Sequence, residues 1–161
     1  MTTTWTAGPT EGYATGAAEV CPACSHRAFL PQPLGRRTAL ESPEAAAELL
    51  SPAFVGADRE RCVAALLDTK HRVLELATVS VGSIDHTFMS PREVFRDALL
   101  ANAAAMVVAH NHPSGDPEPS TDDQRVTTRL VRAGELVGVE VLDHLVIGGG
   151  TWVSLARRGH V

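Results

Sequence analysis

The stretch AAAMVVAHNHPSGDPEPSTDD, residues 103–123, contains the features that decide the fold. It begins with small and aliphatic residues, which predict a buried strand over 104–109 that runs directly into His110. A loop rich in proline and glycine follows, and Ser120 then begins a helix. In α/β folds, an irregular loop after a strand end commonly carries the chemistry. The stretch therefore predicts a functional site between one strand and one helix.

Three side chains in this stretch have the chemistry of zinc ligands. His110 and His112 are separated by one residue, so a continuing strand points both imidazoles to the same side. Asn111, between them, then faces away. With Ser120 as the N-cap, Asp123 is the third helical residue and projects from the first turn. Two imidazoles and one carboxylate leave a fourth zinc position open for water, as in catalytic zinc sites.

The spacing alone leaves blander interpretations open. Two histidines near a strand end are often hydrogen-bonded loop residues rather than ligands. Ser120 and Asp123 also have the spacing of a plain helix cap, because an acidic residue is favourable at a helix N-terminus. Ser114 and Asp116, in the loop, are sufficiently explained by turn formation.

The rest of the chain predicts strands and helices interleaved around this stretch. Ser42-Pro43-Glu44 has the pattern of a helix start, and Ser90-Pro91-Arg92-Glu93 has the pattern of a capping box. Gly138 ends the helix that Ser120 begins. The predicted elements are a helix at 43–50, a hairpin of strands at 62–68 and 72–80, helices at 91–103 and 120–137, and strands at 104–109, 139–147 and 151–155. This order predicts an α/β fold, with a mixed sheet flanked by helices.

Both longer helices have an expected apolar face. In the helix at 91–103 the apolar positions on one face are Val94, Leu99, Leu100 and Ala103. In the following helix they are Val126, Leu130, Val131 and Leu136. We expect these faces to pack on the sheet.

The composition is that of one globular domain with an extension. The 161 residues are 44% hydrophobic and have a formal net charge of −5. Without a run of Lys or Arg, direct nucleic-acid binding is not expected. The sequence shows neither a signal-peptide pattern nor an apolar stretch of membrane-spanning length, so we expect a cytoplasmic protein without membrane contact. Residues 1–40, rich in Thr, Gly, Ala and Pro, are expected to be a loosely ordered N-terminal extension ahead of a domain at 41–161.

The cysteines do not indicate a disulfide framework. There are three, an odd number, in a chain without a secretion signal. Cys21 and Cys24, with His26 nearby, form half of a zinc-ribbon pattern. Structural zinc requires four ligands, so thiols in a loose segment are the favoured interpretation.

The remaining histidines have weaker signals. His144 lies in an apolar strand beside Asp143, which favours a buried, hydrogen-bonded histidine, with support of the metal ligands as the alternative. His71, His86 and His160 have no partner at ligand spacing and are expected at the surface.

Several motifs resemble one known family. His110-x-His112, seven residues, Ser120, two residues and Asp123 resemble the JAMM (MPN+) metalloprotease motif. The sequences His-Asn-His-Pro-Ser-Gly-Asp-Pro at 110–117, Ser-Pro-Arg-Glu-Val-Phe at 90–95 and Asp-His-Leu-Val-Ile at 143–147 resemble the RadC family within that group. The resemblance runs from about residue 58 to residue 155. It implies a JAB/MPN-like, cytidine-deaminase-like three-layer fold, and a RadC-like JAMM domain at 41–161.

The resemblance also implies roles for particular residues. It implies that His110, His112 and Asp123 hold a zinc ion, Zn²⁺, as the cofactor. A glutamate at the start of an upstream strand belongs to the family pattern, and Glu60 matches its position. Glu60 would act as general base and then general acid, while Ser120 would donate a hydrogen bond to the oxyanion. From the residues alone, Glu60 is one surface charge in the cluster at 58–61.

Two functions follow from the resemblance. The first is a zinc metallopeptidase or isopeptidase, whose peptide or isopeptide substrate the sequence does not identify. The second is a non-catalytic accessory factor in DNA repair or recombination. The complete set of metal-binding and catalytic residue types favours the enzyme. Many RadC-like chains carry a helix-hairpin-helix region ahead of this domain, and residues 1–51 show no such pattern, so we expect a short form.

Overall fold

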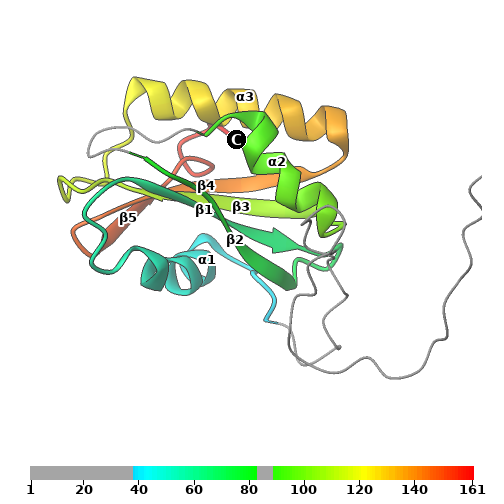
Figure 1. The fold of residues 1–161 in the computed structure, drawn as a ribbon, viewed down its shortest axis with the longest axis horizontal. Helices are drawn as coiled ribbons and strands as arrows, with labels where there is room; N and C mark the ends of the chain where they lie inside the picture. Colours follow the sequence, from blue (N-terminus) through cyan, green and yellow to red (C-terminus); the bar gives the residue numbers. More distant parts are fainter. Residues whose placement is uncertain (1–37, 83–88) are drawn as a thin grey trace, which may run out of the picture. The chain divides into compact units, whose positions relative to one another are not determined.

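The computed structural model describes residues 38–82 and 89–161, which form a mixed five-stranded sheet with helices packed on it (Figure 1). The helices are α1 (Pro43–Leu50), α2 (Pro91–Leu100) and α3 (Thr121–Val137), with a short 3₁₀ helix, η1 (Ser51–Phe54). The strands are β1 (Arg61–Leu67), β2 (Val73–Val81), β3 (Ala105–Asn111), β4 (Glu140–Gly148) and β5 (Thr151–Ser154). Every predicted helix and strand is present in the predicted order, and the α/β class is confirmed. In the described part of the chain, no helix has the length and apolar character needed to span a membrane.

Some predictions fall on residues that the structure does not describe. The expected loosely ordered extension at 1–40 lies almost entirely in residues 1–37, outside the described part. Cys21, Cys24, His26 and His86 are also outside it. Cys62 lies within it, as a buried free cysteine in β1. The predictions for the first four of these residues and for the extension therefore stay predictions.

The sheet has the strand order β2-β1-β3-β4-β5. Strands β1 and β2 form the predicted hairpin, β1 also pairs antiparallel with β3, and β4 pairs antiparallel with β5. Strands β3 and β4 are parallel, and α3 makes the crossover that a parallel pair requires. Because β3 is central and buried along its whole length, its last residues are held on both sides by neighbouring strands.

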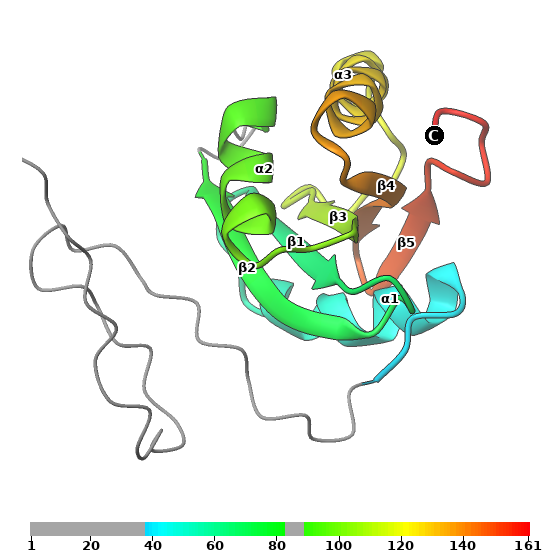
Figure 2. The same ribbon diagram turned by 90° about the vertical axis from the view of Figure 1, so that its right-hand side faces the viewer.

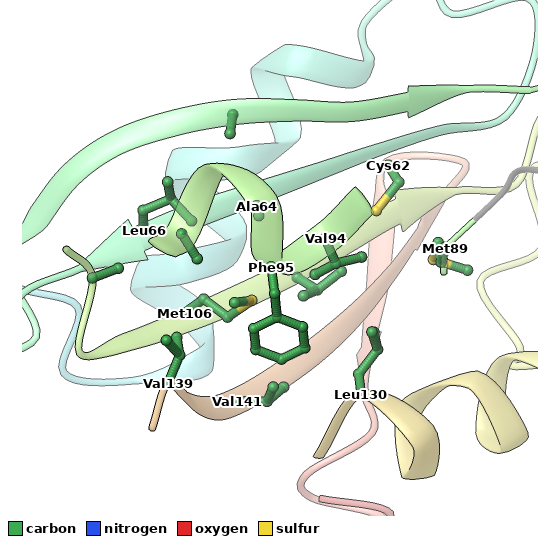
Figure 3. Close-up of a cluster of buried hydrophobic side chains, with 14 residues drawn as sticks. Cys62, Ala64, Leu66, Met89, Val94, Phe95, Met106, Leu130, Val139 and Val141 are labelled. Carbon is green, nitrogen blue, oxygen red and sulfur yellow. The ribbon is translucent and has the colours of Figure 1, made fainter. Parts of the chain in front are cut away.

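Three layers result: α2 and α3 cover one face of the sheet, and α1 covers the other (Figure 2). Under α2 and α3, a cluster of buried side chains joins both helices to the sheet (Figure 3). Its larger members are Leu66, Met89, Val94, Phe95, Met106, Val108, Leu130, Val139 and Val141. A second cluster lies under α1 and includes Leu50, Phe54, Leu67, Val107, Leu145 and Ile147. The alternation of β3 thus fills both faces, with even-numbered residues toward α3 and odd-numbered residues toward α1.

The start of α2 differs from the prediction. Ser90 is the N-cap and Pro91 is the first helical residue, as expected, but the Ser90 side chain makes no capping hydrogen bond. The N–H groups of Glu93 and Val94 instead donate to the backbone carbonyl of Ser90, each at 3.1 Å. The Glu93 N–H therefore donates to the Ser90 carbonyl rather than to the Ser90 side chain, and the predicted capping box is absent.

The apolar faces of both helices were predicted only in part. In α2 the buried residues are Val94, Phe95 and Ala98, whereas Leu99 and Leu100 are 51% and 41% exposed. The helix ends at Leu100 rather than at 103. Ala103, the fourth residue predicted on its apolar face, is buried but follows the helix. The face that packs is the i, i+1, i+4 set, which the periodicity did not single out.

In α3 the buried positions are Asp123, Thr127, Leu130 and Gly134. Two of them are polar, and Leu136, predicted to pack, is 88% exposed. The helix is therefore oriented by polar residues at its start, which a search for apolar periodicity does not detect.

Candidate metal centre

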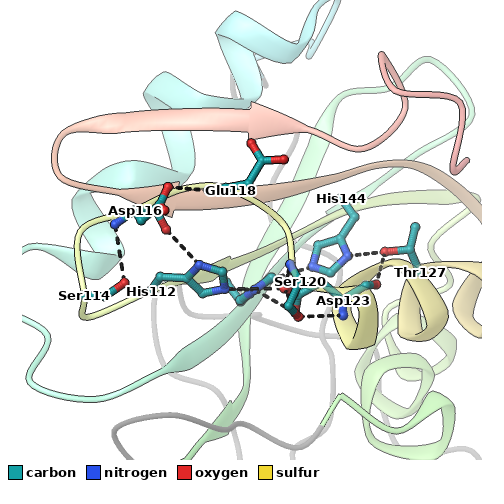
Figure 4. A network of polar contacts seen from close by, with 9 residues as sticks. His112, Ser114, Asp116, Glu118, Ser120, Asp123, Thr127 and His144 are labelled. Atoms are coloured by element: carbon teal, nitrogen blue, oxygen red, sulfur yellow. Dashed lines mark hydrogen bonds and ion pairs between the residues drawn. The ribbon is translucent and has the colours of Figure 1, made fainter.

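Three predicted ligands, His110, His112 and Asp123, converge where β3 ends and α3 begins, and Figure 4 shows His112 beside Ser120 and Asp123. The Nε2 atoms of His110 and His112 are 3.1 Å apart. Asp123 Oδ1 lies 3.1 Å from His110 Nε2, and Asp123 Oδ2 lies 3.4 Å from His112 Nε2. The strand alternation produces the first half of this arrangement. Both imidazoles face α3, while Asn111 pairs with Ile147, a member of the cluster under α1, and faces that other side of the sheet.

These distances suit a tetrahedral metal ion. Zinc–nitrogen bonds of about 2.0–2.1 Å separate two ligand atoms by about 3.3 Å at tetrahedral angles. One ligand atom from each of His110, His112 and Asp123 can be chosen so that all lie within 4.8 Å of one another. His110 is fully buried, but the side chains of His112 and Asp123 are 16% and 10% exposed, so the cluster reaches solvent. The residues present fit a metal ion with three protein ligands and one accessible side.

The first turn of α3 fixes the carboxylate. The Ser120 N–H donates to Asp123 Oδ2 at 2.7 Å, and the Asp123 N–H donates to Ser120 Oγ at 3.1 Å. This reciprocal pair is a capping box, so the helix cap and the ligand geometry are one structure. The Ser120 hydroxyl also donates to Asp123 Oδ2 at 2.6 Å. Its proton is thus directed at the carboxylate here, and the predicted oxyanion role of Ser120 stays a prediction.

The electrostatics keep Asp123 ionised. Burial opposes ionisation, but hydrogen bonds from His110 and His112 outweigh it and hold the pKa of Asp123 far below its usual range. The hydrogen bond to Asp123 in turn raises the pKa of His112, against the opposing effect of burial. The Asp116 carbonyl and the charges of Asp123 and Glu60 add smaller raising effects on this pKa. An ionised carboxylate beside two imidazoles is the protonation state that metal binding needs on the acidic ligand.

Each histidine ligand is held by its other ring nitrogen. His112 Nδ1 lies 2.8 Å from the backbone carbonyl of Asp116, in the loop between the ligands. His110 Nδ1 lies 2.8 Å from Nε2 of His144, whose own Nδ1 lies 2.6 Å from the Thr127 hydroxyl (Figure 4). The expectation of a buried, hydrogen-bonded His144 is therefore confirmed. Such contacts to the remote nitrogen orient metal-binding imidazoles.

The loop between the ligands rests on the turn between β4 and β5. A Cβ atom on Gly148 would lie 2.8 Å from both the carbonyl oxygen of Gly115 and the nitrogen of Pro117. The loop can lie this close only because Gly148 has no side chain. The backbone N–H of His112 also donates to Ile147 at 2.8 Å. The end of β4 and the β4–β5 turn thus hold this loop in place, including the Asp116 carbonyl that contacts His112.

The Asn111 side chain holds the backbone on both sides of Glu60. Its Oδ1 accepts from the Arg61 N–H at 2.8 Å, and its Nδ2 donates to the Arg59 carbonyl at 3.2 Å. The Glu60 carbonyl accepts from the Gly82 N–H at 2.8 Å. Glu60 therefore precedes β1 on a backbone segment tied to the residue between the two histidine ligands, and its charge contributes to the raised pKa of His112.

Sequence reasoning missed two residues of this arrangement. Asn111 was expected only to face away, although its place between two ligands was a signal for a supporting role. Thr127 was not selected at all, and its one signal was a polar residue four positions after Asp123, on the same helical face. Among the other described histidines, His71 is exposed, as expected, whereas His160 is partly buried; neither belongs to the His110, His112 and Asp123 group.

Comparison with known proteins gives a consistent result. A family model described as RadC-like JAB domain matches residues 40–160. A UPF0758 protein of Alcanivorax borkumensis is 49% identical over 135 residues, which are 84% of this chain and 60% of that protein. A UPF0758 protein of Moorella thermoacetica is 49% identical over 122 residues, 76% of this chain and 53% of that protein. A third, from Shouchella clausii, is 46% identical over 123 residues, 76% and 54% of the two chains. The chain thus spans little more than half the length of these curated relatives.

Proposed function

This chain belongs to the family of RadC-like JAB domains, and from that premise we propose that it is a zinc-dependent hydrolase of peptide or isopeptide bonds. The observation that carries the proposal is the convergence of His110, His112 and Asp123 at tetrahedral spacing, with one side open to solvent. Catalytic zinc sites have this donor set and an open position, whereas structural sites are closed by a fourth protein ligand. A cytoplasmic location, expected from the sequence, is part of the proposal.

The chemistry divides between the metal ion and the protein. When bound, a zinc ion supplies a Lewis acid that makes a water molecule acidic near neutral pH. Glu60 would accept the proton of the attacking water at a carboxylate oxygen and would later donate it to the leaving amine. Asn111 holds the backbone that presents Glu60, through its contacts to Arg61 and Arg59.

Ser120 has two hydrogen-bonding roles in the proposal: it caps α3, and it donates to the developing oxyanion. To stabilise the developing oxyanion, the Ser120 hydroxyl must turn its proton from Asp123 to the substrate. The carboxylate then still accepts from the Ser120 backbone N–H at 2.7 Å, so it keeps a donor. The hydroxyl oxygen still accepts from the Asp123 N–H at 3.1 Å, which preserves the helix cap.

The proposal is tested with the wild-type chain, a Glu60→Gln variant and a Glu135→Gln control on the exposed side of α3. We expect about one zinc ion per chain in all three by metal analysis, because neither glutamate is a ligand. Hydrolysis is assayed on a peptide library and a lysine-linked isopeptide library. Glu60→Gln should lower the rate by about 10²- to 10⁴-fold, the usual contribution of a general base, and Glu135→Gln should not.

Two outcomes would contradict the proposal. One is a wild-type chain that binds no zinc, and the other is a Glu60→Gln variant with the wild-type rate. A zinc-free chain that binds DNA with a steep salt dependence would instead support the accessory function in repair or recombination.

A further inference from the structure

His144 reaches the metal centre because of an irregularity in β4. The pairing with β3 shifts between Met106 and Val107, so Met106 pairs with Val141 and Val107 pairs with Asp143. One extra residue, Leu142, is thereby inserted in β4. Side chains alternate along a strand, and without the insertion His144 would face α1. The bulge turns it to the face of α3, where His110 lies, and bulges beside active sites commonly redirect a side chain in this way.

A buried chain of three contacts connects His110 to the backbone of α3, and Figure 4 shows the contact between His144 and Thr127 within it. His110 Nδ1 lies 2.8 Å from His144 Nε2, and His144 Nδ1 lies 2.6 Å from Thr127 Oγ1. Thr127 Oγ1 lies 2.7 Å from the carbonyl oxygen of Asp123. The side chains of His110, His144 and Thr127 belong to residues with 0% exposure, so water does not replace these partners.

The hydrogen bonds of this chain of contacts can run in either of two directions, depending on which atom of each pair donates. If the Thr127 hydroxyl donates to the Asp123 carbonyl, its oxygen must accept from His144 Nδ1–H. His144 Nε2 then accepts from His110 Nδ1–H, which leaves the lone pair of His110 Nε2 free for a metal ion. Every contact in this direction holds one proton.

The opposite direction is less favourable for metal binding, for two reasons. If the Thr127 hydroxyl donates to His144, two acceptor oxygens, Thr127 Oγ1 and the Asp123 carbonyl, face each other at 2.7 Å without a proton between them. His144 would then donate to His110 Nδ1, and the proton of His110 would lie on Nε2. There it can donate to Asp123 Oδ1 at 3.1 Å, but it occupies the lone pair that a metal ion needs. Both directions have a neutral His144, which its complete burial favours.

We propose that His144 and Thr127 select the Nδ1-protonated form of His110 and thereby set the metal affinity of the centre. This inference rests on the proposed function only in that it assumes a metal ion at the His110 Nε2 atom. His144 and Thr127 are positioning residues, because neither is a ligand. The carbonyl of Asp123, which can only accept, fixes the direction of the chain.

The test compares zinc affinity in the 161-residue chain, measured by competition with a chromophoric chelator. Thr127→Val removes the hydroxyl at nearly constant shape and should weaken zinc binding about 10- to 100-fold, the usual effect of losing such a partner. Thr127→Ser restores the hydroxyl and should return the affinity to within about threefold of wild type. Thr128→Val is the matched control, because the Thr128 hydroxyl donates to the Gln124 carbonyl in the same way but on the exposed face of α3.

The outcomes separate the inference from the proposed function. A wild-type chain that binds no zinc overturns the proposed function, and this inference with it. A wild-type chain that binds zinc while Thr127→Val binds it equally well overturns the inference alone, as does a Thr127→Ser variant as weak as Thr127→Val. Long-range ¹⁵N–¹H spectra of the zinc-loaded wild-type chain add a direct readout. Protons on Nδ1 of both His110 and His144 are expected, and a proton on Nε2 of His144 would overturn the inference.

Discussion

Helices α2 and α3 cover the same face of the sheet and begin with the same residue types, a serine N-cap and an acid at the third position, but they serve different purposes. In α2 the Ser90 side chain makes no cap bond, and the buried residues are apolar. In α3 the Ser120 and Asp123 side chains form a closed capping box, and Asp123 also faces two histidines. The same helix-start residues thus form part of a candidate metal site in α3, where the end of β3 presents two histidines to them, and only a helix start in α2.

The largest effect expected from this comparison is on packing by α2. Phe95 is 4% exposed and lies in the cluster between α2, α3 and the sheet. Phe95→Ala should lower the free energy of unfolding by about 3–5 kcal/mol, because it removes a buried ring and leaves a cavity. Urea unfolding measures this loss. The control is Leu99→Ala, at a half-exposed position, which should lower the free energy of unfolding by only about 0.5 kcal/mol. Equal losses in the two variants would show that α2 does not pack as described.

The next effect is on metal binding by α3. Asp123→Ala should weaken zinc binding more than 100-fold, above the range seen for groups that only support ligands. This corresponds to more than about 2.7 kcal/mol. Glu93→Ala, at the equivalent position of α2, should leave zinc affinity unchanged. Isothermal titration of both variants with zinc measures these affinities. An Asp123→Ala chain that binds zinc like wild type would remove Asp123 from the ligand set.

A smaller effect is expected where α3 contacts its neighbours. A Cβ on Gly134 would lie 2.4 Å from the carbonyl oxygen of Val139 and 3.3 Å from the ring of Phe95. Helix propensity alone favours alanine over glycine by about 1 kcal/mol. Crowding against backbone should reverse that sign, so Gly134→Ala is expected to destabilise by about 1–3 kcal/mol in thermal unfolding. A stabilised variant would show that α3 sits farther from β4.

The smallest effect separates the two serine caps. In chelator-treated protein, Ser120→Ala should lower the free energy of unfolding by about 1 kcal/mol, because it removes the acceptor for the Asp123 N–H. Ser90→Ala should change it by less than about 0.5 kcal/mol, since its side chain makes no cap bond. Both changes in the free energy of unfolding are obtained from the denaturant midpoints, provided that the unfolding transitions of the variants and the wild type have the same slope. Similar losses would mean that the α2 cap uses the Ser90 side chain after all.

Strand alternation and helix spacing are local rules, and they were sufficient for the element order and for the placement of the three candidate ligands. The choice of a metal site over hydrogen-bonded loop residues and a plain helix cap came from the family resemblance. Alternation placed His110 and His112 on one side, and the distance from Ser120 placed Asp123 in the first turn. Glu60 came only from the family resemblance. Its neighbours in sequence are charged, and the Asn111 contacts that hold its backbone span about fifty residues.

The remaining misses have physical causes. The bulge at Leu142 has no sequence signature, so the face that His144 occupies could not be derived from alternation. The orientation of α3 depends on Asp123 and Thr127, which are polar and buried, so counting apolar residues gave Leu136 a core position that it does not have. Contacts between elements that are distant in the sequence, rather than local pattern, decided both features.

The contact of Gly148 with the ligand loop has a consequence for labelling this protein. Short surface turns are attractive places to insert an affinity tag or a fluorophore. At the β4–β5 turn, however, a Cβ atom on Gly148, the last residue of β4, or on Gly149 would meet the carbonyl oxygen of Gly115 and would lift the segment that carries Asp116. The exposed β1–β2 turn at residues 69–70 lies at the opposite end of these strands, so an insertion there leaves the histidine pair undisturbed.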